Sequence, residues 1–423
     1  MKNQLTELYA SGRLGIAPGK LSGDVFVPQS KSAAHRALIM AFLSGDIELA
    51  KIDESCVSDD IKATKRALIS MGKALAAQQN DAEPIEIDCK ESGSTLRFLI
   101  PLVAVLGIPT KFVGSGRLPI RPIKEYEGVF EGSGAEMKYL DETGLSLPLL
   151  ITGKMKAGEY KLPGNVSSQY ISGLLMALSY ADGASKLTLT TELESRPYVD
   201  LTCEVMREFG VEVSEETDGY SLKGEKKPSR TGAFTVEADY SQAAFWLVAN
   251  YLGSEVELKN LPKKTAQGDR AIVDLLAGLK NAEESGEVFE MDARDVPDLV
   301  PVFAVAAAAT NCLTKIVHAE RLRIKESDRI ASTSAMLSEL GVKNEITEDG
   351  LKIEGKRNTD KCFSGGTVDS CKDHRLVMAA AIAATCASDT VWIKDPVAVE
   401  KSYPSFFEDY VHVGGTINGI NVG

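Results

Sequence analysis

Cationic and hydroxyl side chains gather in a few short stretches of this sequence. Residues 29–36 read QSKSAAHR and hold two cations and two hydroxyls, and residues 117–122 hold two arginines next to prolines. Residues 321–329 pack four cations and two carboxylates into nine positions. Arginine binds planar carboxylates and phosphates through a bidentate fork, and lysine binds phosphate as a point charge. These stretches therefore predict the binding of small anions, with carboxylates at hand for proton transfer.

Smaller groups of polar residues complete this set. Residues 91–97, ESGSTLR, contain a glycine at which a ligand could approach the backbone, and residues 166–170, VSSQY, offer neutral donors. Further candidates are Asp298, the triplet 373–375 (DHR), and a turn that begins at 395 and ends in Lys401. Each also has a plainer interpretation, because Ser and Asp are ordinary helix N-caps and a charge run is usually a solvated face. If 321–329 is a helix start, Lys325 and Arg329 would share one face of it.

A repeated element positions nearly all of these residues. A short strand, a Pro or acidic residue, a few polar residues and an Ala/Leu-rich helix recur in copies that start at Val25, Ile85, Tyr160, Phe234, Phe289 and Gly366. The polar residues lie between the strand end and the first helical turn. A helix N-terminus exposes unpaired N–H groups and the positive end of the dipole, which favour phosphate and carboxylate. The six junctions are therefore candidate ligand-binding positions.

The helices of the repeats are apolar almost all round, as in AVAAAAT at 304–310 and VMAAAIAAT at 377–385. Helices of this kind are buried. Further strands are expected at 186–190 and 255–260, and a second helix at 58–72. We therefore predict an α/β (α+β) protein of two similar domains, each of three repeats with helices inside and sheets outside. The alternative from the repeats alone is a passive solenoid or propeller scaffold.

Composition limits the possible partners. A chain of 423 residues is long enough for two domains, and a net charge of −13 with a pI near 5.0 argues against nucleic acid or an anionic membrane as partner. No apolar run approaches membrane-spanning length, and residues 1–14 lack the apolar core of a secretory signal. Seven cysteines without a C-x-x-C pair and only four histidines indicate reduced thiols and no metal centre. A cytoplasmic location is expected.

Taken together and in this order, the segments resemble the 5-enolpyruvylshikimate-3-phosphate synthase family over nearly the whole chain. The most specific elements are R-x-K-E-S-D-R at 323–329 and D-H-R at 373–375; S-S-Q at 167–169, S-R-P-Y at 195–198 and L-P-I-R-P at 118–122 also match. The resemblance implies two domains of three βαβαββ units each, an inverse α/β prism. One would span 29–236 and the other 1–28 plus 237–423, with crossing strands near 25–30 and 233–238.

The resemblance also implies an activity. Enzymes of this family transfer the enolpyruvyl group of phosphoenolpyruvate to the 5-hydroxyl of shikimate 3-phosphate and release phosphate, by way of a tetrahedral intermediate. The step belongs to the shikimate pathway, which leads to chorismate and aromatic amino acids, and the family is the target of glyphosate. No cofactor and no metal are implied, and a monomer is expected.

Residue roles follow from the same resemblance. The residues implied in binding shikimate 3-phosphate are Lys31, Ser32, Arg36, Ser167, Ser168, Gln169, Ser195, Tyr198, Asp298 and Lys325. Those implied in binding phosphoenolpyruvate are Lys31, Gly93, Arg121, Gln169, Arg329, Arg375 and Lys401. The implied catalytic residues are Asp298, Glu326 and Lys31. The chain departs from the family at Glu91 and Arg321, where Asn is common, so the resemblance assigns neither side chain a role.

Charge balance agrees with this assignment. The two substrates carry two phosphates at about −1.5 to −2 each and two carboxylates, roughly five or six negative charges. The implied site supplies seven cations and two carboxylates from both halves of the chain. Neither half alone can neutralise the ligands, so we expect binding to draw the two domains together.

The sequence argues against three other functions. The UDP-N-acetylglucosamine enolpyruvyl transferases share this fold and chemistry, but they carry a reactive cysteine in the loop that matches 111–121, and KFVGSGRLPIR has none. A repeat scaffold gives no reason for cations and carboxylates to collect at the junctions of an acidic chain. A P-loop phosphotransferase would need G-x-x-x-x-G-K-[ST], which the sequence lacks.

Overall fold

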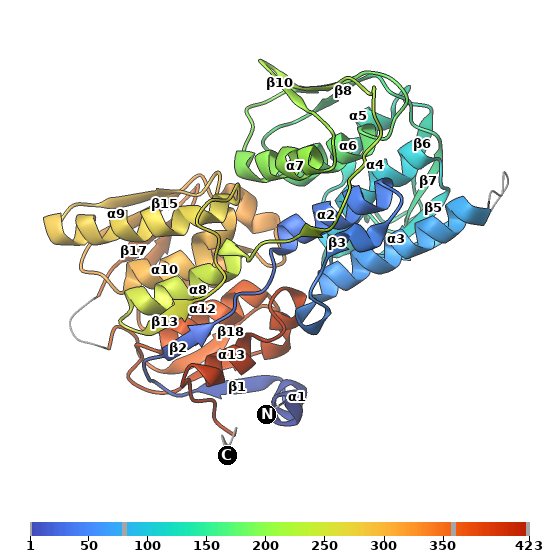
Figure 1. Ribbon diagram of the computed structural model, residues 1–423. Helices are drawn as coiled ribbons and strands as arrows, with labels where there is room; N and C mark the ends of the chain where they lie inside the picture. The colour runs from blue at the N-terminus through green and yellow to red at the C-terminus, as the bar shows by residue number, and fades with distance from the viewer. Residues whose placement is uncertain (1, 78–82, 357–360, 420–423) are drawn as a thin grey trace. The chain divides into compact units, whose positions relative to one another are not determined.

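A strand followed by a buried helix occurs at all six predicted positions of the computed structural model, which describes residues 2–77, 83–356 and 361–419 (Figure 1). The pairs are β2 (Ser22–Val25) with α2 (Lys31–Leu43), β4 (Ile85–Asp88) with α4 (Gly93–Leu106), β8 (Glu159–Leu162) with α6 (Ser168–Leu178), β12 (Phe234–Thr235) with α8 (Tyr240–Tyr251), β14 (Phe289–Asp292) with α10 (Val300–Ala308), and β18 (Gly366–Asp369) with α12 (His374–Ala384). The predicted repeat is confirmed.

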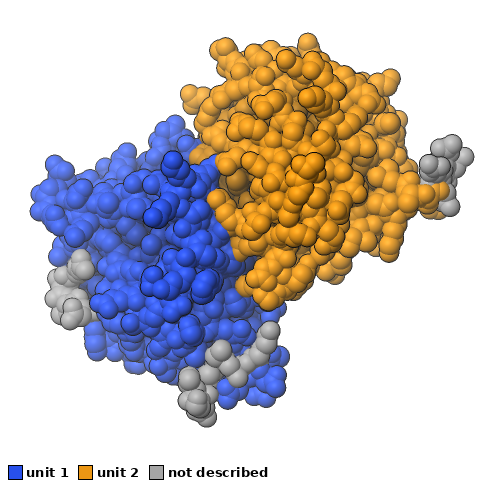
Figure 2. All heavy atoms as spheres, viewed as in Figure 1, with its two compact units in different colours: residues 1–28, 238–423 blue, residues 29–237 orange. Residues whose placement is uncertain are grey.

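The repeats form two compact units. Unit 1 comprises residues 1–28 and 238–423, and unit 2 comprises residues 29–237 (Figure 2). The chain thus leaves unit 1 once, builds all of unit 2, and returns. The mixed α/β class predicted from the sequence is confirmed.

Three repeats are complete βαβαββ units with one shared strand order. Their sheets are β4-β5-β7-β6, β8-β9-β11-β10 and β14-β15-β17-β16. The remaining bounds are β5 (Thr110–Val113), β6 (Ala135–Tyr139), β7 (Leu149–Gly153), β9 (Ser185–Leu189), β10 (Ser214–Glu216), β11 (Gly219–Leu222), β15 (Leu313–Val317), β16 (Asn344–Ile346) and β17 (Leu351–Glu354). In each sheet the first two strands are parallel and joined by a buried helix, and the last two are antiparallel.

Two repeats exchange their first strands. Strand β2 leads into α2 of unit 2 but pairs with β13 (Glu255–Leu258) of unit 1, whereas β12 leads into α8 of unit 1 but pairs with β3 (Ala50–Lys51) of unit 2. The sixth repeat is completed from the N-terminus, because β1 (Arg13–Ile16) pairs with β19 (Val391–Lys394), which also pairs with β18. Each chain crossing therefore coincides with a strand exchange.

The first helix of each repeat lies in the core, as the sequence predicts. All nine residues of α10 and all eleven of α12 are buried. The second helices are amphipathic or lie at the edges: α3 (Asp59–Ala77), α7 (Arg196–Glu208), α9 (Ile272–Ser285), α11 (Arg329–Glu339) and α13 (Phe406–His412), with the short α5 (Glu127–Phe130) and α1 (Lys2–Ala10). Within the described residues, no helix is both long and apolar enough to cross a membrane.

Side-chain caps fix where five of the six core helices begin. The oxygens of Ser30, Ser92, Ser167, Asp239 and Asp373 accept from backbone N–H groups of the first turns of α2, α4, α6, α8 and α12. The sixth core helix, α10, follows the short turn η6 (Pro297–Leu299) and has proline in its first turn. The plainer interpretation of these Ser and Asp residues as N-caps is thus correct, and the chemistry of each junction rests on their neighbours.

Candidate active site

The first junction of unit 2 combines one paired and one buried cation. Lys31 opens α2, and its Nζ lies 2.9 Å from Oδ2 of Asp60 on α3. Arg36, one turn further along α2, is 2 % exposed. Ser32, between them, is half-buried, and its carbonyl accepts from Nη1 of Arg36 at 2.7 Å.

The partners of Arg36 are all neutral. Its Nε donates to Oγ1 of Thr202 at 2.6 Å, and its Nη2 donates to Oγ of Ser172 at 3.2 Å and to the carbonyl of Tyr198 at 2.9 Å. Burial lowers the pKa of Arg36 to about 10, so the guanidinium stays charged at neutral pH. No carboxylate in the described part of the chain pairs with it. A buried cation without a counter-charge is costly unless an anion joins it.

A second group of cations surrounds Gly93 at the start of α4. Arg97, 4 % exposed, donates from Nη1 to Oε1 of Gln169 at 2.8 Å and from Nη2 to the carbonyl of Pro122 at 3.0 Å. A Cβ placed on Gly93 would lie 2.8 Å from Nη1 of Arg121 and 2.9 Å from Nη1 of Arg97. The glycine is therefore needed for two guanidinium groups to meet beside the helix N-terminus.

The third junction and the start of α7 provide neutral groups. Ser167 caps α6, Ser168 is buried, and Nε2 of Gln169 donates to Oγ of Ser94 at 2.9 Å. Ser195 precedes α7 in the left-handed conformation, with φ of 55°. Gln169 thus bridges the second and third junctions, between Arg97 and Ser94.

A buried chain of hydroxyls links the first and second junctions. Nδ1 of His35 lies 2.8 Å from Oγ1 of Thr64, which lies 2.7 Å from Oγ1 of Thr95, and that hydroxyl lies 2.8 Å from Oγ of Ser92. Burial, with Lys31 and Arg36 nearby, holds the pKa of His35 well below its ordinary value, so the ring is neutral. The chain fixes α2, α3 and α4 relative to one another without adding charge.

In unit 1 the corresponding residues form an ion-pair cluster around Arg329. This side chain is 2 % exposed and donates from Nη1 to Asp298 at 2.7 Å, from Nη2 to Glu326 at 2.7 Å and from Nε to Asp373 at 2.8 Å. The three carboxylates use three of its five N–H groups. They raise the pKa of Arg329 well above its ordinary value although burial opposes the charge.

Asp298 joins this cluster to Arg375. Its Oδ2 lies 2.7 Å from Nη2 of Arg375, and its carbonyl accepts from Nη1 of the same residue at 3.1 Å. Burial alone would raise the pKa of Asp298, but Arg375, Arg329 and Lys325 outweigh it and hold the pKa far below its ordinary value. Asp298 is therefore ionised at neutral pH and can accept a proton.

The segment 321–329 is not a helix start, so the predicted shared face of Lys325 and Arg329 is wrong. The short turn η7 (Glu320–Ile324) ends before Lys325, which is extended, and α11 begins at Arg329 with Asp328 as its cap. Burial is the largest cause that lowers the pKa of Lys325 to about 8. Nη2 of Arg321 donates to the carbonyl of Arg294 at 2.6 Å.

Lys401 ends the short helix η8 (Pro396–Lys401) and reaches the sixth junction. Its Nζ donates at 3.0 Å to the carbonyl of Lys372, which precedes Asp373.

Left-handed backbone at non-glycine residues recurs beside the junctions, at Lys90, Ser195, Cys371, Lys372 and Asp395. Such conformations cost about 1–3 kcal/mol each and collect at functional sites.

Three residues of these clusters were given no individual role in binding or catalysis from the sequence. Arg97 lies inside a motif that was recognised, as does Asp373 of the D-H-R triplet. Asp269 lies in η5 (Gly268–Ala271), 4 % exposed, and its Oδ2 accepts from Oγ of Ser241. No sequence signal pointed to Asp269, because its neighbours in the fold, Ser241, Asp298 and Arg375, are distant from it in the sequence.

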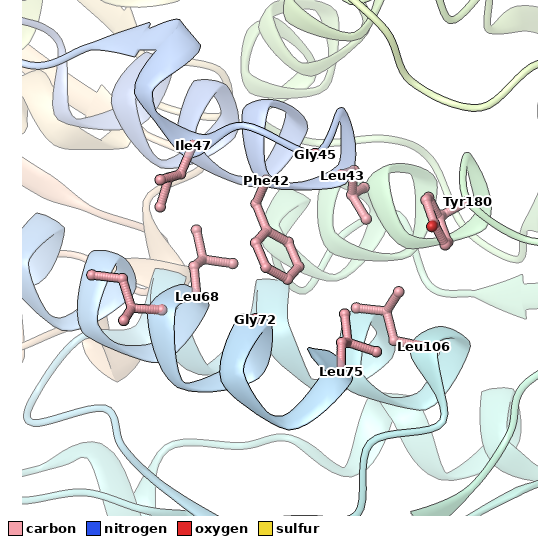
Figure 3. Close-up of a pocket in the computed structure, with 10 residues that line it drawn as sticks. Phe42, Leu43, Gly45, Ile47, Leu68, Gly72, Leu75, Leu106 and Tyr180 are labelled. Carbon is pink, nitrogen blue, oxygen red and sulfur yellow. The ribbon is translucent and has the colours of Figure 1, made fainter. Parts of the chain in front are cut away.

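The apolar pocket in unit 2 does not belong to this site. It has a volume of about 340 Å³ and is lined by Phe42, Leu43, Gly45, Ile47, Leu68, Ile69, Gly72, Leu75, Leu106 and Tyr180 (Figure 3). Phe42 and Leu106 stand at the C-terminal ends of α2 and α4, opposite the junctions. Its lining holds no charged side chain, so it does not suit an anion. Elsewhere, the described residues contain no group of three or more His, Cys, Asp or Glu that could hold a metal.

The fold is found in solved enolpyruvyl transferases. An EPSP synthase from Acinetobacter baumannii superposes with a TM-score of 0.73 at 24 % identity, covering 96 % of this chain and 99 % of that one. The enolpyruvyl transferase NikO from Streptomyces tendae superposes with a TM-score of 0.67 at 15 % identity, covering 96 % and 98 %. The architecture is thus that of this class of transferase.

Sequence comparison defines the family within the class. Residues 16–410 match the family described as EPSP synthase (3-phosphoshikimate 1-carboxyvinyltransferase). Proteins named 3-phosphoshikimate 1-carboxyvinyltransferase from Clostridium novyi and Clostridium acetobutylicum are each 40 % identical, over 96 % of this chain and 99 % of theirs. The chain belongs to the EPSP synthase family. It is a transferase whose reaction is the enolpyruvyl transfer of the shikimate pathway, in aromatic amino acid biosynthesis.

Proposed function

We propose that this chain transfers the enolpyruvyl group of phosphoenolpyruvate to the 5-hydroxyl of shikimate 3-phosphate, and that the junction residues of both units hold the substrates. The observation that carries the proposal is the pair of buried arginines in unit 2, Arg36 and Arg97, which donate to hydroxyl, amide and carbonyl oxygens. Buried positive charge of this kind is stabilised by a bound anion. The family membership makes a phosphorylated, carboxylated substrate the natural anion.

Shikimate 3-phosphate would bind mainly to unit 2, through Lys31, Ser32, Arg36, Ser167, Ser168, Gln169, Ser195 and Tyr198, with Asp298 and Lys325 from unit 1. The bonding of Arg36 refines its role. Four of its five N–H groups are engaged with neutral acceptors, so it retains one N–H on Nη1 for a ligand. Arg36 would therefore act largely through its charge, while Lys31 and the serines contact the phosphate and ring.

Phosphoenolpyruvate would bind to Lys31, Gly93, Arg121 and Gln169 of unit 2 and to Arg329, Arg375 and Lys401 of unit 1. The bidentate fork of Arg375 suits the substrate carboxylate, and the lysines suit its phosphate. Because Arg329 already donates hydrogen bonds to three carboxylates, it has two N–H groups left for the ligand.

The ionised state of Asp298 favours this residue as the base that takes the proton from the 5-hydroxyl. Glu326, in its protonated form, would then donate its proton to the methylene carbon of phosphoenolpyruvate, and Lys31 would stabilise charge at the reacting groups. A pKa far below normal makes Asp298 a weak base while Arg375 and Arg329 bind it. When the carboxylate of phosphoenolpyruvate takes over part of these arginines, the pKa of Asp298 rises, so substrate binding would activate the base.

The remaining expectations are a monomer in the cytoplasm, with residues of both units closing on the substrates. The seven cysteines form no C-x-x-C pair, which supports a reducing compartment. Small-angle scattering with and without shikimate 3-phosphate plus an unreactive phosphoenolpyruvate analogue tests closure. A smaller radius of gyration with both ligands is expected, and an unchanged radius would argue against it.

A phosphate-release assay tests the activity itself. Release should require both shikimate 3-phosphate and phosphoenolpyruvate, with no added metal. Equally fast release with UDP-N-acetylglucosamine as the acceptor would instead favour the related transferase activity.

A further inference from the structure

Neither the sequence motifs nor the family resemblance assigned a particular residue of the fourth junction to a substrate. This junction nevertheless contacts the site in unit 1. Ser241, in the first turn of α8, accepts from Nη2 of Arg375 at 3.3 Å through its Oγ. The same hydroxyl donates to Oδ2 of Asp269. All three residues are at most 8 % exposed. A buried chain therefore runs from the Arg375 guanidinium through one hydroxyl to a carboxylate.

The location of Asp269 is fixed by the residue two positions before it. Oε1 of Gln267 accepts from the backbone N–H of Tyr240 at 3.0 Å, and its Nε2 donates to the carbonyl of Ala238 at 2.8 Å. These bonds fasten the segment that carries Asp269 to the start of α8. The register between Asp269 and Ser241 is thereby set by the backbone, and not only by the contact of the two side chains.

The next residue of the same turn reaches the segment that ends in Lys401. Nε2 of Gln242, which is 1 % exposed, donates to Oγ of Ser402 at 2.6 Å. One turn of α8 is thus bonded both to Arg375 and to the neighbour of Lys401. Two of the three cations of unit 1 that are proposed to bind phosphoenolpyruvate, Arg375 and Lys401, share this support.

We propose that Ser241 and Asp269 are positioning residues that hold the Arg375 guanidinium in place for the carboxylate of phosphoenolpyruvate. This inference rests on the proposed function. Asp298 also binds Arg375, but as the base it must loosen its hold when substrate arrives and when it takes a proton. The bond from Ser241 lies outside that exchange. It keeps one hydrogen bond of Nη2 in place while Asp298, which binds the same nitrogen, loosens its hold.

The chain from Arg375 through Ser241 to Asp269 is here called the relay. Because of the charges around Asp269, the strength of the relay should depend on pH. The carboxyl faces Asp298 of η6, Arg375 of α12 and Asp239 of α8, together with the hydroxyl of Ser241. Burial, followed by Asp298, raises the pKa of Asp269 to about 7, against the effect of Arg375. Below that pH the protonated carboxyl is a weaker acceptor for Ser241, so the hold on Arg375 weakens. Affinity for phosphoenolpyruvate should therefore fall as the pH drops below about 7.

The test compares Ser241→Ala, Ser241→Thr and Asp269→Asn with wild type in steady-state kinetics and in direct titration with phosphoenolpyruvate. Ser241→Ala and Asp269→Asn should raise KM for phosphoenolpyruvate by about tenfold, the loss of roughly one hydrogen bond to a charged group, with kcat and KM for shikimate 3-phosphate changed much less. Ser241→Thr retains the hydroxyl and should restore most of the affinity. Asp269→Asn should also remove the decline in affinity below about pH 7.

Ser254→Ala is the matched control, because Ser254 is a buried serine just beyond the other end of the same helix. Its Oγ accepts from the backbone of Leu21, and its loss should leave KM unchanged. Equal KM values for wild type, Ser241→Ala and Asp269→Asn would overturn the relay. If Asp269→Asn does not fold, Ser241→Ala and its threonine counterpart decide the matter alone. Absence of phosphate release by wild type would overturn the proposed function itself, which separates the two failures.

Discussion

The buried arginines of the two units differ in the charge of their hydrogen-bond partners. In unit 2, Arg36 and Arg97 donate to hydroxyls, an amide oxygen and carbonyls. In unit 1, Arg329 and Arg375 donate to three carboxylates, and a fourth, Asp269, accepts from Ser241, which itself accepts from Arg375. Uncompensated cations add net attraction for an anion, whereas compensated ones must exchange one partner for another. Arginine thus attracts the substrate through uncompensated charge in unit 2, whereas in unit 1 it exchanges a carboxylate partner for the substrate.

The largest expected effect tests whether the carboxylates of unit 1 do chemistry. Glu326→Gln keeps the size of the side chain and an acceptor for Arg329, but it removes the titrating group. We expect kcat to fall by about 10²–10⁴ with far smaller changes in substrate affinity. Glu320→Gln, an exposed glutamate six residues earlier, is the control and should be neutral. Near-normal turnover of Glu326→Gln would exclude the proton-transfer role.

A stability comparison separates the two settings directly. Arg329→Met leaves three carboxylates without their shared cation, so the free energy of unfolding should fall by about 3–5 kcal/mol. Arg36→Met removes a buried charge whose partners are neutral and should cost only about 1–2 kcal/mol. Urea unfolding of both variants without ligand measures the difference. Equal losses would contradict the contrast between the units.

The pH dependence of shikimate 3-phosphate binding tests Lys325, a cation of unit 1 whose pKa is lowered. Lys325 has a pKa of about 8 in the folded protein, against an ordinary value of 10.5. Above pH 8 it loses the charge that would meet the phosphate, so kcat/KM for this substrate should decline. Lys325→Arg stays charged and should move that decline to higher pH. An unchanged profile in the variant would assign the decline to another group.

The effect of the Lys325 titration on the free energy of unfolding provides the control for that pH experiment. Between pH 8 and 10.5 the unfolded chain binds more protons at Lys325 than the folded one does, so this group makes the free energy of unfolding rise with pH. A loss of activity just above pH 8 therefore does not reflect unfolding caused by this lysine. Thermal unfolding over the same pH range checks the sign.

The smallest expected effect concerns the glycine between the two guanidinium groups of unit 2. In Gly93→Ala the new methyl must displace the end of Arg121, which lies 2.8 Å from the added carbon. We expect KM for phosphoenolpyruvate to rise several-fold, about 1 kcal/mol, and inhibition by glyphosate, the longer molecule, to weaken more. Gly128→Ala, on α5 with nothing within 4 Å, is the matched control. Equal inhibition of parent and variant would place Gly93 outside the inhibitor's pocket.

The repeats could be predicted because their signals are local. Ser92 caps α4 and Gly107 ends it in the left-handed conformation, so both ends of this apolar helix are marked in the sequence. Similar marks at the other junctions are enough to define strand, turn and helix. The fold class follows, because a helix that is apolar all round must be covered on every side.

The clusters could not be predicted in the same way, because their members lie far apart in the sequence. Arg329 meets Asp298 and Asp373, which are tens of residues away in either direction, and no spacing rule connects them. The error at Lys325 had a local cause that the sequence does contain. Asp328 is a good N-cap, and it starts the helix at Arg329, so Lys325 is left outside.

The strand exchange has a consequence for the order in which the protein is made. Residues 29–237 form a whole unit from one continuous stretch, so they can fold as soon as the ribosome has released them. The first strands of the nascent chain have no such opportunity. Strand β2 cannot pair until β13 has been synthesised. Strand β1 cannot pair until β19 has been synthesised, where Arg13 pairs with Lys394. The unit that contains the beginning of the chain is thus the last to be completed.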